Sequence, residues 1–265
     1  MNIETNGIQI HCVIEGEGPW LTLSHSLACD LSMWDAQAAL LARRFKVLRF
    51  DTRGHGRSSA PAGPYTLEQM AEDLHGLFGA LGIRQTHFVG LSMGGMIGET
   101  YALEHPGVFR SMVLADTTSR RPPEAAEMWG ERIRIAQTQG MEALVASTLA
   151  RWFTEPFRKA RPEVMARIGE VIRNTPVAGF CGCCAAIAQV DVLERLKEIA
   201  CPALVMVGDQ DHGTPPEMAV QIQRNLRGSE LITIASAAHI SNVEQPEAFN
   251  AAMLAFLERV SAAAA

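Results

Sequence analysis

One pentapeptide, Gly90-Leu-Ser-Met-Gly94, could supply a nucleophilic serine. It fits the pattern G-x-S-x-G, in which a sharp turn between a strand and a helix projects the serine hydroxyl. Glycine suits both flanking positions because only it tolerates such close packing. An apolar stretch (87–89) precedes the pentapeptide and a stretch of small residues (94–98) follows it. This strand–turn–helix setting is what the motif requires, so we predict that Ser92 is a nucleophile.

A serine hydroxyl needs a base that removes its proton and an acid that orients the base. For a nucleophile on this kind of turn, the acid and then a histidine follow later in the chain. Asp209 and Asp211 both come directly after a late apolar segment, and we favour Asp211. His239 follows the last apolar segment. Each residue alone could be a turn serine, a helix cap or a structural histidine. Their order at segment ends favours a Ser92–Asp211–His239 triad.

Acyl transfer by serine also requires two N–H groups that stabilise the oxyanion of the tetrahedral intermediate. The first should be the amide of Met93, the residue after the nucleophile. The second should lie in the loop after the apolar segment 20–24, which reads His25-Ser-Leu27. We assign it to Leu27. A plain turn at the end of a strand is the alternative for this loop.

The elements that must position these residues alternate between strand and helix. Seven segments have strand character: 7–15, 20–24, 45–50, 86–90, 111–115, 202–208 and 230–234. Apolar residues at spacings of three and four predict a helix over 67–81, and an amphipathic helix is expected over 247–260. Such alternation is typical of an α/β fold with a mostly parallel sheet that carries helices on both faces.

The alternation stops after Asp116. Residues 119–190 contain no convincing strand, and prolines at 122, 123, 156, 162 and 176 divide the segment into short helices. We therefore expect one α/β core, built from 1–118 and 191–265, with a helical cap inserted at 119–190.

Composition narrows the class of protein. The 265 residues include 48% hydrophobic and 20% charged residues, which is typical of a globular protein. A net charge of −6 argues against a nucleic-acid partner. No apolar run reaches the roughly 18 residues that span a membrane, and the N-terminus lacks the features of a signal peptide, so we expect a cytoplasmic protein. The oligomeric state stays open, a homo-oligomer included.

Six cysteines are present, and Cys181-Gly-Cys-Cys184 is their only cluster. It lacks a second Cys/His pair at zinc-finger spacing, and its neighbours are apolar. We expect buried thiols without a ligand. Metal binding or redox chemistry is the alternative.

Longer motifs resemble the α/β-hydrolases along nearly the whole chain. Asp51-Thr-Arg-Gly-His-Gly-Arg-Ser58 is similar to the family signature D-x-R-G-x-G-x-S. The chain resembles the 3-oxoadipate enol-lactonases in particular, and the stretches that carry this resemblance are 26–34, 51–58, 60–66, 90–95, 151–154 (Arg-Trp-Phe-Thr) and 239–244. It differs from them at two places beside the oxyanion loop, with His25 in place of asparagine and Ala28-Cys29 in place of Gly-Thr.

The resemblance implies an α/β-hydrolase fold with an eight-stranded, mostly parallel sheet. It also implies hydrolysis of a small enol-lactone with a free carboxylate, in the breakdown of aromatic compounds by the β-ketoadipate pathway. A small-molecule substrate is expected, and neither a metal nor an organic cofactor. For substrate contacts we assign Trp152 to a wall of the site, Arg151 to the carboxylate and His25 to the oxyanion end. A core tryptophan and a solvated arginine are the alternatives.

Other functions stay open. The departures at His25 and Cys29 leave room for a carboxylesterase acting on neutral esters or amides. A C–C bond hydrolase or a cofactor-free perhydrolase could use the same triad. A receptor that binds ligand without turnover is the non-enzymatic alternative, although the complete set of triad residues argues against it.

Overall fold

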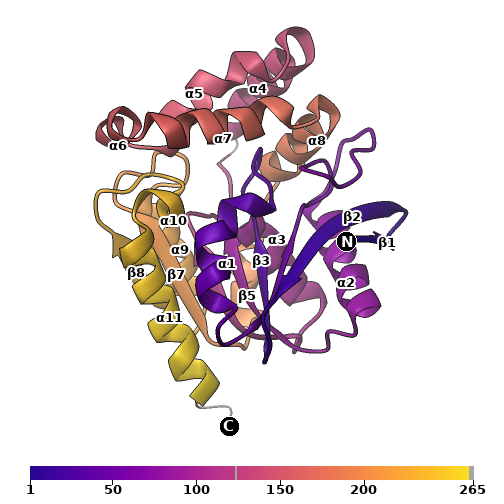
Figure 1. The fold of residues 1–265 in the computed structure, drawn as a ribbon, viewed down its shortest axis with the longest axis vertical. Coiled ribbons are helices and arrows are strands. Elements are labelled where there is room, and N and C mark those ends of the chain that lie inside the picture. Colours follow the sequence, from indigo (N-terminus) through magenta and orange to yellow (C-terminus); the bar gives the residue numbers. More distant parts are fainter. Residues whose placement is uncertain (123, 263–265) are drawn as a thin grey trace.

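Eight strands form one mixed sheet in the computed structural model, which describes residues 1–122 and 124–262 (Figure 1). Their order across the sheet is β1 (Asn2–Thr5), β2 (Ile8–Glu15), β4 (Lys46–Phe50), β3 (Trp20–Ser24), β5 (Thr86–Leu91), β6 (Phe109–Ala115), β7 (Ala203–Gly208) and β8 (Glu230–Ile234). The pairs β1–β2 and β2–β4 are antiparallel; from β4 to β8 all neighbours are parallel. The predicted sheet is therefore confirmed.

All seven predicted strands are present, with ends that differ by no more than two residues. The eighth strand, β1, was missing from the segments read from the sequence. It has four residues and only Thr5 is buried, so it carries no run of apolar residues. It is held by pairing with β2, from Asn2 opposite His11 to Thr5 opposite Ile8.

Helices cover both faces of the sheet. In Figure 1, α1 (Asp35–Leu41) and α11 (Pro246–Ala262) lie in front of it, and α2 (Leu67–Leu81) and α3 (Met93–Glu104) lie behind. The remaining core helices are η1 (Leu31–Trp34), η2 (Leu193–Glu198), α9 (Pro216–Asn225) and α10 (Ser241–Glu244). Strands β5 and β7 are buried along their whole length, as expected for a sheet covered on both faces. Predicted helix 67–81 is confirmed with the same ends, and 247–260 becomes α11.

The segment between β6 and β7 is a helical insertion, as predicted. It contains α4 (Ala125–Gln139), α5 (Glu142–Trp152), α6 (Glu155–Ala160), α7 (Pro162–Asn174) and α8 (Val177–Ala188), which lie above the sheet in Figure 1. Prolines mark helix starts rather than ends, since Pro156 and Pro162 occupy first turns and Pro176 is an N-cap. Pro122 precedes α4, and Pro123 lies outside the described residues.

The chain enters and leaves the insertion at one place. Arg120 and Asp191 form an isolated antiparallel bridge, and Arg120 Nε lies 2.6 Å from Asp191 Oδ1. This juxtaposition supports our proposed division of the chain into a core (1–118 and 191–265, of which 263–265 lie outside the described residues) and a cap (119–190).

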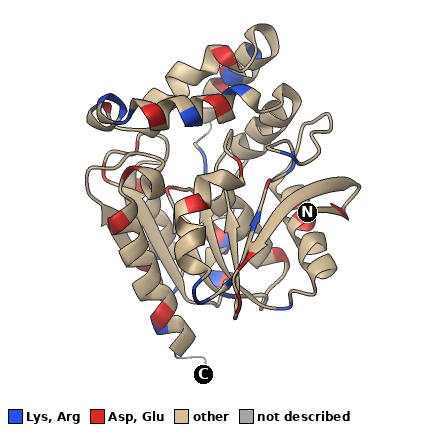
Figure 2. Cartoon of the chain, in the orientation of Figure 1, with Lys and Arg blue, Asp and Glu red and all other residues tan. Residues whose placement is uncertain are grey.

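Figure 2 shows acidic and basic residues interspersed over both cap and core in this view. Within the described part of the chain, no single helix is long and apolar enough to cross a membrane. Only the pair α7 and α8, bent by 94°, meets the length and composition criteria together.

Glu99 is a buried acid on α3, the helix that follows Ser92. Its Oε1 accepts a hydrogen bond from Ser119 Oγ at 2.8 Å, and its Oε2 has no partner among the described residues. Burial raises the pKa of Glu99 to about 8, although the bond from Ser119 opposes this shift. An unfolded glutamate releases its proton near pH 4.5, so the folded state binds more protons between pH 4.5 and about 8. Stability should therefore fall as the pH rises through this window.

We expect Glu99→Gln to remove this pH dependence. The free energy of unfolding should rise relative to wild type by a few kcal/mol at about pH 9, where wild type must hold a buried charge, and should change little at about pH 4.5. Urea unfolding at the two pH values measures the difference. An equal change at both would show that Glu99 does not titrate as described.

Candidate active site

Ser92 occupies the turn between β5 and α3, with φ 55° and ψ −117°. A positive φ is unusual for serine, so surrounding contacts must hold it. The Ser92 N–H donates to Ala115 O at 2.9 Å, and Thr117 Oγ1 donates to Ser92 O at 2.7 Å. A Cβ on Gly94 would lie 2.2 Å from Ser24 O, so only glycine permits this approach of α3 to β3.

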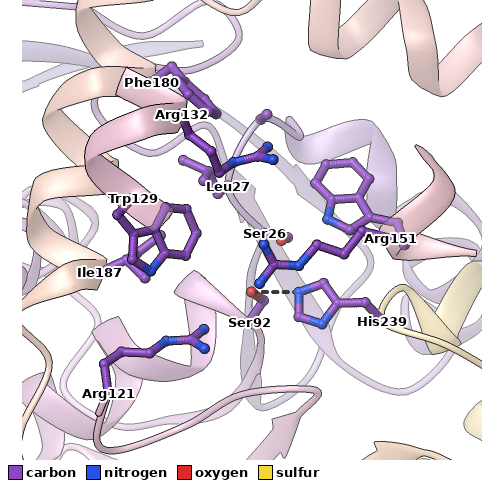
Figure 3. A pocket seen from close by; sticks show the side chains of 12 residues that line it. Ser26, Leu27, Ser92, Arg121, Trp129, Arg132, Arg151, Phe180, Ile187 and His239 are labelled. Carbon is purple, nitrogen blue, oxygen red and sulfur yellow. Dashed lines mark hydrogen bonds between the residues drawn. The ribbon is translucent and has the colours of Figure 1, made fainter. Parts of the chain in front are cut away.

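The loops after β7 and β8 bring Asp211 and His239 to this turn. Ser92 Oγ lies 2.9 Å from His239 Nε2, and His239 Nδ1 lies 2.8 Å from Asp211 Oδ2. Figure 3 shows the first of these contacts as a dashed line. All three side chains are buried. The structure thus brings together the three residues predicted from their order in the chain; it has the geometry that a serine nucleophile, its base and an orienting acid require.

Asp211 is held as a carboxylate. It accepts hydrogen bonds from the amides of Gly213 and Thr214 at 2.6 and 3.0 Å, and from Thr214 Oγ1 at 2.7 Å. Burial alone would raise its pKa. The His239 charge and the hydrogen bonds from His239 and Thr214 outweigh burial, so the pKa of Asp211 is lowered. Asp209, the second candidate, is exposed and accepts from the Ala237 amide instead.

Asp116, which the sequence analysis did not single out, is a second buried acid near Asp211. Gly208 N–H and Ser241 Oγ donate to its two carboxyl oxygens. Burial, and next the charge of Asp211, raise the pKa of Asp116 well above its usual range. Among the described carboxyl groups, only that of Asp211 hydrogen-bonds to His239.

Glu244 connects the histidine loop to the cap. One carboxylate oxygen accepts from the Ala238 amide at 2.8 Å, next to His239. The other accepts from both the amide and the hydroxyl of Thr154, at 2.9 and 2.5 Å. The segments 151–154 and 239–244, which carried the resemblance in the sequence, are therefore in direct contact.

The two predicted oxyanion donors lie on either side of Ser92. Met93 is the first residue of α3, so its N–H has no helical acceptor four residues earlier. Leu27 lines the cavity above Ser92, and its N–H donates to no acceptor among the described residues. Both amides are thus available to a ligand, as the assignment requires; their catalytic role is part of our proposal.

His25 does not contact substrate, and this prediction is wrong. Its side chain is fully buried and does not line the cavity. Its Nδ1 donates to Ser26 O at 2.7 Å, and its Nε2 accepts from the Thr52 amide at 3.0 Å. Both ring nitrogens form hydrogen bonds with backbone groups, so His25 stabilises the oxyanion loop without facing the cavity.

His55 has a similar role, which sequence reasoning missed. Its Nε2 accepts from the amide of Ala28, a residue in the left-handed region with φ 55°. Burial lowers the pKa of His55 to about 3, and the adjacent His25 adds to this effect. A neutral ring can accept this bond, whereas a protonated one cannot. The histidine of the Asp51–Ser58 signature thereby supports the loop that carries Leu27.

A cavity opens over Ser92 and His239 between the core and the cap. Trp152 and Arg151 line it, as predicted, together with Ser26, Leu27, Ala28, Arg121, Trp129, Arg132, Phe180 and Ile187. In Figure 3 the guanidinium groups of Arg121, Arg132 and Arg151 point toward the space around Ser92. They come from the loop after β6, from α4 and from α5.

A family model for the alpha/beta hydrolase fold matches residues 19–246. The chain belongs to the α/β hydrolases. This match spans the turn of Ser92, the whole cap and the histidine loop.

Similar proteins include lactonases and esterases. The chain is 36% identical to 3-oxoadipate enol-lactonase 2 of Acinetobacter baylyi, over 92% of this chain and 91% of that one. Its structure matches the enol-lactonase of Burkholderia xenovorans LB400 with a TM-score of 0.94 and 39% identity, over 97% and 100% of the two chains. It also matches a malate-bound thermophilic esterase of Thermogutta terrifontis, with a TM-score of 0.93 and 30% identity over 98% of each chain.

Five cavity residues of this α/β hydrolase escaped the sequence analysis: Arg121, Trp129, Arg132, Phe180 and Ile187. No motif marks them, because only the folding of the chain brings the loop after β6, α4 and α8 over Ser92. The cysteine cluster lies on α8 but does not line the cavity: Cys183 and Cys184 are buried and Cys181 is half-buried. Burial raises the pKa of all three thiols. Among the described residues, no group of three or more His, Cys, Asp or Glu is arranged to hold a metal ion.

Proposed function

We propose that this α/β hydrolase opens small enol-lactones that carry a free carboxylate, of the 3-oxoadipate enol-lactone type. The observation that carries the proposal is the pairing of the Ser92–His239–Asp211 chain with a cavity into which three arginines point. The enol-lactonase relatives support the reaction, and the esterase of similar structure that binds malate supports recognition of a carboxylate by a protein of this fold.

The mechanism follows from the geometry. His239 Nε2 accepts the proton of Ser92 Oγ as this oxygen attacks the lactone carbonyl, and the amides of Leu27 and Met93 stabilise the oxyanion. Collapse breaks the bond between the carbonyl carbon and the ring oxygen, and His239 returns the proton to the leaving oxygen. Water, activated by His239, then hydrolyses the acyl-enzyme. Asp211 holds the imidazole in the required tautomer.

This mechanism needs no metal and no organic cofactor. The substrate class would place the enzyme in aromatic-compound breakdown, in the β-ketoadipate pathway. A cytoplasmic location, the absence of a nucleic-acid or membrane partner and a possible homo-oligomer remain predictions.

Arg151→Ala tests recognition of the carboxylate. A guanidinium that pairs with a substrate carboxylate contributes about 1.5–3 kcal/mol, so KM for the charged lactone should rise about tenfold or more. KM for a neutral ester such as p-nitrophenyl acetate should change much less. Steady-state kinetics with both substrates measure this split. Equal effects on the two would remove Arg151 from carboxylate recognition.

Hydrolysis of neutral esters is the second candidate, which the similarity to the thermophilic esterase favours. The values of kcat/KM for an enol-lactone, an aliphatic lactone and simple esters, on one preparation, separate the two. A preference for the charged enol-lactone supports the lactonase, and a preference for neutral esters supports the esterase.

A further inference from the structure

The cavity over Ser92 contains more positive charge than one carboxylate can balance. Arg121, Arg132 and Arg151 are partly buried, and none of them forms an ion pair with a carboxylate among the described residues. Each guanidinium carbon lies within 6.0 Å of the ring centroid of Trp129. Burial, and next the charge of Arg151, lower the pKa of Arg121 to about 10. The free protein therefore holds three mutually repelling cations around one ring.

The cavity also contains polar atoms without partners. Among the described residues, Arg121 Nε, Arg132 Nε, Trp129 Nε1 and Ser26 Oγ are buried and make no hydrogen bond. A buried donor without an acceptor destabilises the protein that contains it. All four belong to side chains that line this one cavity, so unpartnered polar groups are concentrated where a ligand would bind.

The three arginines form two groups. Arg121 Nη1 donates to Gly213 O at 2.9 Å, and a Cβ on Gly213 would lie 3.3 Å from Arg151 Nε and 3.2 Å from His239 Nδ1. We name Arg121 and Arg151 the proximal pair, because both lie beside Gly213, which is next to the catalytic histidine. Arg132 donates to Thr148 Oγ1 at 2.9 Å and lies 5.7 Å from the Phe180 ring centroid. It is the distal arginine, on the Leu27 and Phe180 side in Figure 3.

We propose that this cavity has two anion subsites and binds linear dicarboxylates more tightly than monocarboxylates of the same length. The distal arginine holds one carboxylate, and the proximal pair holds a second one next to Ser92. Planar guanidinium groups suit this task because they bind carboxylates through two parallel hydrogen bonds. This arrangement assigns the lactone's own carboxylate to Arg132 and leaves the proximal pair for the carboxylate that ring opening creates. A rise in KM of Arg151→Ala that is selective for the charged lactone would instead assign the lactone carboxylate to Arg151.

One consequence of the two subsites, inhibition by the product, rests on the proposed function. Hydrolysis adds water across the bond between the carbonyl carbon and the ring oxygen, and the acid that forms loses a proton. A lactone with one carboxylate thus becomes a dicarboxylate. The second negative charge appears beside the proximal pair, so the product should bind more tightly than the substrate and inhibit the enzyme.

Calorimetric titration of the Ser92→Ala protein with adipate and with hexanoate, at equal ionic strength, tests the proposal without turnover. We expect Kd for adipate to be at least about tenfold lower than for hexanoate. Arg132→Gln in the same background should remove most of this preference, and Arg132→Lys, which keeps the charge, should retain part of it. Arg224→Gln, a change of an exposed arginine on α9, is the matched control and should leave the preference intact.

Equal affinities for adipate and hexanoate would overturn the proposal, as would a preference that survives in Arg132→Gln. Activity of the wild type separates this result from failure of the proposed function. If the wild type hydrolyses the lactone but the protein shows no preference for adipate, the two subsites are refuted and the hydrolase assignment stands. If adipate binds tightly but the wild type does not hydrolyse the lactone, the two subsites stand and the lactonase assignment is refuted.

Discussion

Replacing Ser92 with alanine is expected to lower kcat by about 10⁴- to 10⁶-fold while the protein stays folded. The change removes the only hydroxyl within hydrogen-bond distance of His239 Nε2 among the described residues. The oxyanion amides and the cavity remain, so weak residual activity above the uncatalysed rate should persist. Turnover of p-nitrophenyl acetate and of an enol-lactone measures the loss, and the thermal unfolding midpoint checks the fold.

Ser26→Ala is the matched control for this experiment. Ser26 lines the same cavity, but its hydroxyl is not bonded to a base. Its loss should change kcat by less than about tenfold. Turnover that survives in Ser92→Ala would contradict the assigned nucleophile. Absence of turnover in the wild type, with every substrate named here, would instead favour a binding protein.

Asp211→Asn should lower kcat by about 10⁴-fold. Asparagine fits the same space, but its amide NH₂ can point toward His239 Nδ1 and stabilise the tautomer that cannot accept the serine proton. Asp209→Asn is the control, because Asp209 follows the same strand and does not contact His239. Steady-state kinetics on the two variants decide between the aspartates. A larger loss in Asp209→Asn would reverse the assignment.

The lowered pKa of Asp211 also has a consequence for stability. Its carboxylate stabilises the folded state fully above its unfolded pKa of 3.8, and this contribution is lost as the pH falls below that value. Asp211→Asn should therefore weaken the dependence of stability on pH on the acid side.

Most of the sheet could be predicted because buried parallel strands are short apolar runs between turn residues. β5 and β7 are of this kind. β1 could not be predicted in this way, since its pairing with β2 and not its composition makes it a strand. The prolines indicate where the cap helices begin, but they do not indicate how these helices pack.

The same distinction separates the site residues that could be predicted from those that could not. Ser92, Asp211 and His239 could be found because strand ends place them, and strands leave a signal in the sequence. Arg132 lies in the cavity only because α4 packs over the core, and Arg121 only because the loop after β6 folds against Gly213; no local pattern encodes either contact. His25 was misassigned because proximity to the oxyanion loop in sequence does not say on which side of the loop a ring lies.

The contact of Glu244 with Thr154 sets a rule for building chimeras of this enzyme. Glu244 is buried and accepts two hydrogen bonds from Thr154 and one from the Ala238 amide. A transplanted lid without a hydroxyl side chain at position 154 would remove one of these three hydrogen bonds from a buried carboxyl group, and a lid with proline there would remove two. Anyone exchanging lids to alter selectivity should therefore transfer or retain this junction first, before choosing residues that face the bound molecule.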